Sequence, residues 1–159
     1  LMEQMVQEFN HYVLQADILE YLLGRKMGAG DTNQLPEEKV LGDLRRSYVS
    51  GSTVAKAAVL VTEGGGARLF REARKLKGSI LARKIAAAMN VIYQDEKNHF
   101  RTAAREAATT VQTQQELRGM KQAIQRVSQQ RVRMRNEMFL FPFSNHDIRR
   151  CVEKFRRPV

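Results

Sequence analysis

The chain has 159 residues, 43% of them hydrophobic, which suffices to bury one sizeable core but would crowd two domains. Three Pro and ten Gly among many helix-favouring residues predict an all-α fold, and the single cysteine, Cys151, excludes an internal disulfide framework. The formal net charge of +10 permits binding to nucleic acid, although we interpret the basic clusters as solvated helix faces.

The sequence offers no sign of a membrane segment or a leader. It contains no run of about 18 apolar residues, and its first residues lack the basic start and apolar stretch of a signal peptide. We therefore expect a cytoplasmic protein without membrane contact. Because Leu1 already lies inside an apolar-periodic pattern, we also expect that further residues precede it.

Apolar periodicity and helix-stop residues divide the chain into helical segments. The first segment stops near Gly24, and an irregular connection leads to Pro36, which suits the opening of the next helix. A break near Gly51 is an open alternative within that next segment, and Ser79 can cap the one after it. The predicted single domain spans residues 1–143, with helices at about 1–24, 37–77, 79–108 and 112–139, followed by a short C-terminal helix or tail at 144–159.

Two of the three histidines lie three residues after a glutamate, in Glu8-x-x-His11 and Glu96-x-x-His99. On a helix, residues i and i+3 share a face, so each pair can present a carboxylate oxygen and an imidazole nitrogen to one point. Either pair alone is best explained by a packed or hydrogen-bonded histidine. Two such helices facing each other would supply half the ligand shell of two metal ions, and the two pairs together favour this interpretation.

Glu63 is the candidate for a third carboxylate. If the Lys77-Gly78-Ser79 sequence is the turn of a helical hairpin, Glu63 and Glu96 lie roughly sixteen residues before and after it, about 24 Å along each helix. Both would then lie at one level. A buried carboxylate is costly unless a metal or a proton compensates it, and this favours a metal site.

Gly64, Gly65 and Gly66 follow Glu63 directly. Each glycine costs a helix about 1 kcal/mol relative to alanine, so their presence needs an explanation. One interpretation is a local helix bulge that leaves room for dioxygen or substrate beside the metals. The other is that the helix breaks there, and the sequence does not decide between them.

The segment Tyr93-Gln94-Asp95-Glu96-Lys97-Asn98-His99 resembles the Asp-Glu-x-x-His signature on the last metal-binding helix of ferritin-like di-iron carboxylate proteins. Glu8-x-x-His11 resembles the partner motif two helices earlier. The resemblance covers roughly residues 1–110 and implies a ferritin-like antiparallel helical bundle, here with an additional C-terminal helix. The glutamate of the family's first helix has no counterpart, so an upstream helix or a partner chain would have to supply it.

The resemblance also implies a ligand set for two Fe ions, with Mn as the alternative metal. Glu8 and Glu96 would bridge the two metals, and His11 and His99 would each bind one of them. Glu63 would be a terminal ligand. These roles follow from the resemblance and not from the spacing of the residues alone.

Three further residues are expected beside these ligands. Asp95 would accept a hydrogen bond from the imidazole of the opposite motif, which points it at His11. Gln7 stands where the matching acid would be in the first motif, so an asymmetric site is expected. Tyr93 could relay an electron or a proton, although packing is the simpler role.

These expectations describe a non-haem di-iron protein that activates dioxygen, an oxygenase or oxidase of an unknown organic substrate rather than an iron store. Its partners would be dioxygen, that substrate and an unidentified electron donor, and a homodimer stays open. One alternative is a haem-oxygenase-like di-iron oxidase, whose spacing Asp95-x-x-x-His99 would suit. The other is a basic helical nucleic-acid-binding module without metal.

Overall fold

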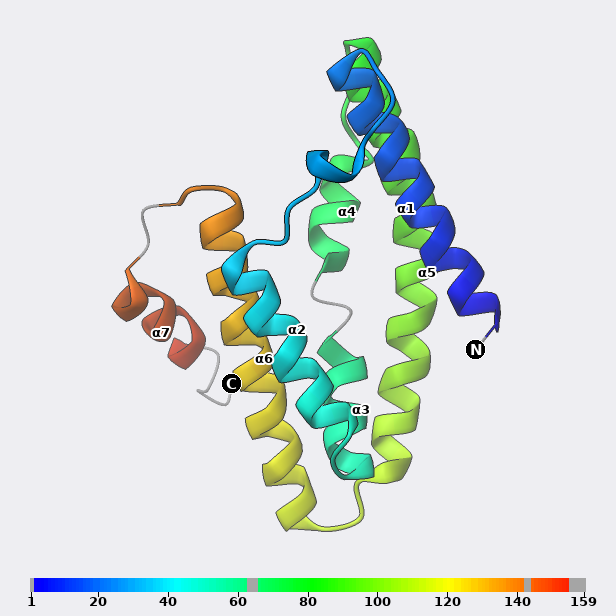
Figure 1. Ribbon diagram of the computed structural model, residues 1–159. Helices are drawn as coiled ribbons and strands as arrows, with labels where there is room; N and C mark the ends of the chain where they lie inside the picture. Colours follow the sequence, from blue (N-terminus) through cyan, green and yellow to red (C-terminus); the bar gives the residue numbers. More distant parts are fainter. Residues whose placement is uncertain (1, 63–65, 142–143, 155–159) are drawn as a thin grey trace. The chain divides into compact units, whose positions relative to one another are not determined.

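The computed structural model describes residues 2–62, 66–141 and 144–154 of the chain. Within these ranges the protein is all-helical, with seven α-helices, one short 3₁₀ helix and no strand (Figure 1). The predicted all-α class is therefore confirmed, while the ferritin-like arrangement stays a prediction. The chain divides into two compact units, and the single domain expected over residues 1–143 also stays a prediction.

Unit 1 comprises residues 1–33 and 64–99. Its elements are α1 (Met2–Leu23), the 3₁₀ helix η1 (Ala29–Asp31), α4 (Ala67–Ala73) and the first part of α5 (Ile80–Thr110). Helices α1 and α5 lie side by side and antiparallel, since the first half of α1 bonds residues in the middle of α5, while Asp17 accepts from Lys84, nearer the start of α5, at 3.0 Å (Figure 1). This pairing of α1 with α5 is what positions the candidate site.

Helix α1 ends where the sequence predicts. Gly24 has a φ of +66°, a left-handed conformation that glycine adopts without the steric cost of a Cβ atom. In the connection that follows, the Arg25 guanidinium donates two hydrogen bonds, of 2.7 and 2.6 Å, to the two carboxylate oxygens of Asp31. These bonds lower the pKa of Asp31 to about 2. The connection after α1 is thus closed by a bidentate ion pair.

The turn between α4 and α5 also agrees with the sequence analysis. Gly78 has a φ of +102°, and the Ser79 hydroxyl accepts a hydrogen bond of 3.1 Å from the Ala82 amide at the start of α5. The Arg74 guanidinium lies 4.5 Å above the ring centroid of Tyr93, which joins the end of α4 to α5. The predicted start of a helix directly after Ser79 is confirmed, whereas the helix before this turn ends at Ala73 and not near residue 77.

Unit 2 comprises residues 34–63 and 100–159. It contains α2 (Pro36–Val49), α3 (Thr53–Val61), the end of α5, α6 (Gln114–Met138) and α7 (Asn145–Lys154). Helices α2, α3 and α7 each pack against α6. Eight of the buried apolar side chains in unit 2 form two clusters, one of Ala57, Ala58, Ala107, Met120 and Ala123, and one of Leu41, Val59 and Val127.

The predicted single helix over residues 37–77 is wrong, because this stretch forms α2, α3 and α4. The Ser50 hydroxyl donates hydrogen bonds to two carbonyl oxygens in the last turn of α2. The Ser52 hydroxyl accepts a hydrogen bond of 3.2 Å from the Ala55 amide and is the N-cap of α3. Serine and glycine favour such caps and turns over a helix interior, so the break allowed near Gly51 is present. Residues 63–65, between α3 and α4, lie outside the described residues.

The C-terminal part follows the prediction more closely. Thr113 and Glu116 form a capping box at the start of α6: the Thr113 hydroxyl accepts from the Glu116 amide at 3.1 Å, and the Glu116 carboxylate accepts from the Thr113 amide at 2.9 Å. The short terminal helix expected after residue 144 is α7, whose Ile148 is 3% exposed. Within the described part of the chain, no helix has the length and apolar content needed to cross a bilayer.

Candidate metal centre

The two Glu-x-x-His motifs come together inside unit 1. Glu8 and His11 share one face of α1, and Glu96 and His99 share one face of α5, as the i, i+3 spacing requires. Because the two helices run antiparallel at this level, the four side chains converge from opposite sides. The His11, His99 and Glu96 side chains are 5%, 12% and 14% exposed, whereas Glu8 at 55% forms the open side of the cluster.

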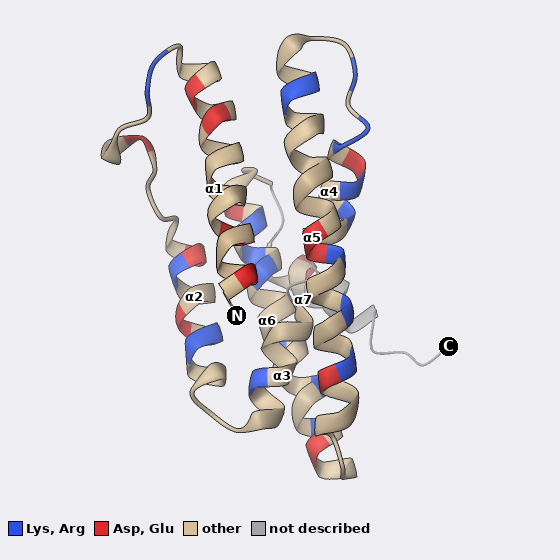
Figure 2. Ribbon diagram, turned by 90° about the vertical axis from the view of Figure 1, so that its right-hand side faces the viewer, with Lys and Arg blue, Asp and Glu red and all other residues tan. Residues whose placement is uncertain are grey.

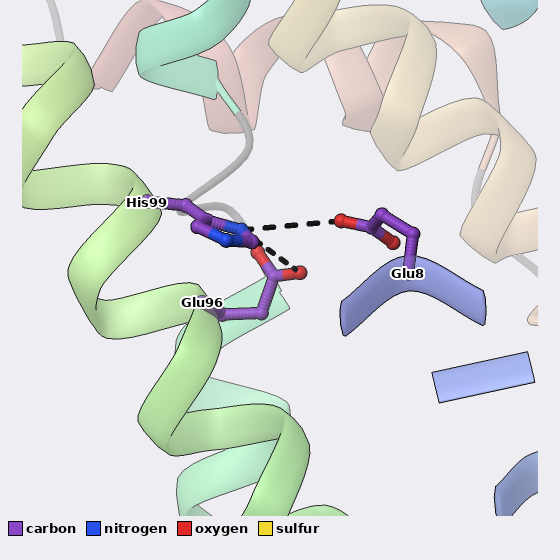
Figure 3. Close-up of side chains that lie close together, drawn as sticks. All are labelled: Glu8, Glu96 and His99. Atoms are coloured by element: carbon purple, nitrogen blue, oxygen red, sulfur yellow. Dashed lines mark ion pairs between the residues drawn. The ribbon is translucent and has the colours of Figure 1, made fainter. Parts of the chain in front are cut away.

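Both imidazoles turn the Nδ1 atom toward the two carboxylates. Nδ1 of His11 lies 3.6 Å from a Glu8 oxygen and 3.9 Å from a Glu96 oxygen. Nδ1 of His99 lies 3.9 Å from the other Glu8 oxygen and 4.0 Å from the same Glu96 oxygen (Figure 3). Glu8, Glu96 and His99 each offer one ligand atom, and these atoms all lie within 4.8 Å of one another.

These separations fit a shared cation better than direct bonding. The contacts around the two Nδ1 atoms, at 3.6–4.0 Å, are too long for hydrogen bonds between nitrogen and oxygen. Two ligands that each lie about 2.0–2.2 Å from one metal ion are roughly 3–4.4 Å apart. The observed spacing is compatible with ligands around an ion.

The opposite nitrogen of each ring is held by a partner across the helix pair. Nε2 of His11 lies 3.0 Å from Oδ2 of Asp95, and Nε2 of His99 lies 2.8 Å from Oε1 of Gln7. Gln7 also donates from its Nε2 to Oδ1 of Asp95 at 3.4 Å. Gln7 and Asp95 thus join the two imidazoles into one hydrogen-bond network.

This network assigns the tautomer that each ring adopts in its neutral form. The Asp95 carboxylate can only accept, so Nε2 of His11 carries the proton. The Gln7 amide donates to Asp95 through its nitrogen, so its oxygen faces His99 and Nε2 of His99 carries the proton as well. The Nδ1 atom of each ring then presents a lone pair to the space between Glu8 and Glu96.

The Nδ1 atom of His99 is the strongest indication that the space between Glu8 and Glu96 could bind a cation. This atom is buried and has no hydrogen-bond partner among the residues that the structure describes. A buried nitrogen of this kind loses its contact with water without a replacement, which is costly. Two imidazole lone pairs and two carboxylates facing one volume are a donor set for a divalent cation.

The local charge agrees with a cation site. Helix α1 contains four acidic residues, Glu3, Glu8, Asp17 and Glu20, and no Lys or Arg, although the chain as a whole carries a formal net charge of +10 (Figure 2). Acidic side chains on one helix lower the electrostatic potential beside it. The site therefore lies against an acidic helix of a basic protein.

Three of the site residues predicted from the sequence fall outside the part of the chain that the structure describes. They are Glu63, Gly64 and Gly65. Gly66 is described and buried, and a Cβ atom added to it would lie 2.8 Å from a ring carbon of Phe70, so the Phe70 ring occupies the space on that side. The ligand role of Glu63 and the pocket at the three glycines stay predictions.

Two contacts went beyond the sequence analysis. Tyr93, expected beside the ligands, lies under the Arg74 guanidinium, which sequence spacing did not indicate. Gln7, interpreted only as a departure from an acid, bonds both His99 and Asp95. The sequence does indicate a contact of Gln7 with the opposite histidine, since Gln7 precedes Glu8 just as Asp95 precedes Glu96. The hydrogen bond between Asp95 and His11 is the contact that the resemblance implied.

Comparisons with known proteins add no relative to this description. No protein-family model matches the chain, and neither the search of curated proteins nor that of solved structures finds a match. Any statement on function therefore rests on the side chains gathered between α1 and α5.

Proposed function

We propose that the protein holds a binuclear metal centre between α1 and α5, with Glu8, His11, Glu96 and His99 as ligands. The observation that carries the proposal is the buried Nδ1 atom of His99, which has no hydrogen-bond partner among the described residues and faces carboxylate oxygens at 3.9 and 4.0 Å. A metal ion at this position would satisfy that nitrogen and offset the charge of the carboxylates.

The arrangement of Glu8 supports two ions rather than one. Its Oε2 atom lies 3.6 Å from Nδ1 of His11, while its Oε1 atom lies 3.9 Å from Nδ1 of His99. One carboxylate thus directs its two oxygens to two different imidazoles. Glu8 would in this way hold one ion together with His11 and a second ion together with His99.

The chemistry of the donors favours iron, with manganese as the alternative. Carboxylate oxygens combined with imidazole nitrogens suit these metals, whereas the cluster contains no thiolate of the kind that soft metals prefer. An upstream helix or a partner chain would supply any further carboxylate.

A reduced di-iron centre supplies dioxygen activation when it is bound, and we propose an oxygenase or oxidase of an organic substrate on this basis. The chain's own residues would hold and orient the metals. Asp95 and Gln7 would keep the Nδ1 lone pairs of His11 and His99 directed at the site. Small molecules would enter on the side of Glu8, which is the most exposed ligand.

The test of this activity is oxygen uptake by the protein loaded anaerobically with Fe(II) and then mixed with oxygenated buffer. We expect uptake in proportion to the bound iron, and loss of that uptake in Glu8→Ala. His146→Ala, which removes the histidine outside the cluster, serves as the matched control and should behave as wild type. Uptake that is equal in wild type and Glu8→Ala would contradict the proposal.

A further inference from the structure

The two imidazoles of the cluster differ in what holds Nε2. His11 bonds the carboxylate of Asp95 at 3.0 Å, whereas His99 bonds the neutral amide of Gln7 at 2.8 Å. We propose that Gln7 is a positioning residue that makes the two metal positions inequivalent, so that the position at His11 fills before the position at His99. This inference rests on the proposed metal centre and adds an order of filling to it.

The physical reason is the strength of the two hydrogen bonds. A bond to an ionised acceptor is roughly twice as strong as one between neutral groups, and a carboxylate on one ring nitrogen raises the basicity of the other. Nδ1 of His11 is therefore the better electron donor to a metal. Nδ1 of His99, backed by an amide, is the weaker one.

Gln7 also fixes the orientation of His99 through its second bond. Because its Nε2 donates to Oδ1 of Asp95 at 3.4 Å, its oxygen is directed at His99 and its nitrogen is not. An amide turned the other way would direct its oxygen at the Asp95 carboxylate, which can only accept, and would lose that bond. Asp95 thus acts on His11 directly and on His99 through Gln7.

The shared position of Asp95 explains why an amide suits residue 7 better than an acid. A glutamate at residue 7 would place a second carboxylate beside that of Asp95, where Gln7 now places its Nε2 atom. Two carboxylates at such a distance repel each other. With Gln7 the network carries one negative charge, and every bond in it joins a donor to an acceptor. With glutamine at residue 7, the two histidines therefore bond different acceptors, a carboxylate and an amide.

The first test needs no metal. In the metal-free protein, ¹⁵N NMR of the histidine rings should show the Nε2–H tautomer for both His11 and His99. Gln7→Met fills a similar volume but offers no strong donor or acceptor, so His99 should become a mixture of tautomers while His11 keeps its own. Gln15→Met on the exposed side of α1 is the matched control.

The second test is an anaerobic titration of the chain with Fe(II). We expect two binding steps in the wild-type protein, and in Gln7→Met a weakening of the second step by about 10- to 100-fold with the first step unchanged. Circular dichroism checks that the variant keeps its helix content, and the tautomer of His11 checks the local fold.

Three outcomes would overturn this inference. An unchanged His99 tautomer in Gln7→Met would remove its structural basis. Two steps of equal affinity that Gln7→Met leaves unchanged would remove the order of filling while the proposed centre stands. Binding of no iron by the wild-type chain would overturn the centre and the order together, so the failures are distinguishable.

Discussion

The imidazole of His11 and the carboxylate of Asp95, 84 residues apart in the sequence, meet across α1 and α5 with 3.0 Å between Nε2 and Oδ2. The bond leaves Nδ1 of His11 facing Glu8 and Glu96. It therefore does for this ring what the proposed centre requires: it fixes the tautomer and directs the lone pair into the site.

Replacing Asp95 with asparagine tests this role. An amide oxygen still accepts from Nε2 of His11, but the bond loses its charge, so we expect iron affinity to fall by about 10- to 100-fold while helix content is unchanged. Anaerobic Fe(II) titration of the two proteins gives the measurement. Asp17→Asn removes the same charge from an exposed position that pairs with Lys84, and it should leave iron affinity close to wild type.

The core of unit 2 gives a prediction about stability. Val127 on α6 is 0% exposed and packs in the cluster with Leu41 and Val59, so Val127→Ala should lower the free energy of unfolding by about 2 kcal/mol through lost contacts and a cavity. Val40→Ala, at a position 51% exposed, should change it by less than about 0.5 kcal/mol. Urea unfolding followed by circular dichroism compares the two, and equal effects would contradict the described core.

The start of α6 offers a second stability test. Thr113→Ala removes the hydroxyl that accepts from the Glu116 amide, and this should cost about 1 kcal/mol of stability. Gln115→Ala changes an exposed residue in the same turn without removing a cap, and it should be nearly neutral. A loss in Gln115→Ala as large as that in Thr113→Ala would argue against the capping box.

The ion pair after α1 makes a prediction about pH. The Arg25 guanidinium lowers the pKa of Asp31 to about 2, so the stabilisation from this pair is complete above about pH 4, the ordinary range of an aspartate, and is lost as the pH falls through 2. NMR titration of the carboxyl carbon should show the low pKa in wild type. Arg25→Gln should return it toward its ordinary range, whereas Arg105→Gln, an exposed arginine of unit 2, should leave it low.

Local chemistry made part of the fold predictable from the sequence. Gly24 ends α1 and Ser79 caps α5 because each acts on its own few residues. The break between α2 and α3 was harder to place, because it depends on the hydrogen bonds of two serine hydroxyls, Ser50 and Ser52. Periodicity reports which face is buried, and it is insensitive to where one helix stops and the next begins.

The candidate site was predictable to a similar degree. Helical spacing alone placed Glu8 beside His11 and Glu96 beside His99, and the resemblance brought the two pairs together. The bond of Gln7 to His99 spans 92 residues and depends on the register of two helices, which no local pattern reports. For the same reason the position of Arg74 over Tyr93 was not foreseen.

The metal centre is tested by the iron content of the chain after anaerobic loading with Fe(II) and removal of unbound metal. We expect about two irons per chain in the wild-type protein and in His146→Ala, and their loss in the double variant Glu96→Ala, His99→Ala. Wild-type protein without bound iron, or a double variant that retains as much as wild type, would contradict the metal centre and would favour a basic helical module that binds nucleic acid.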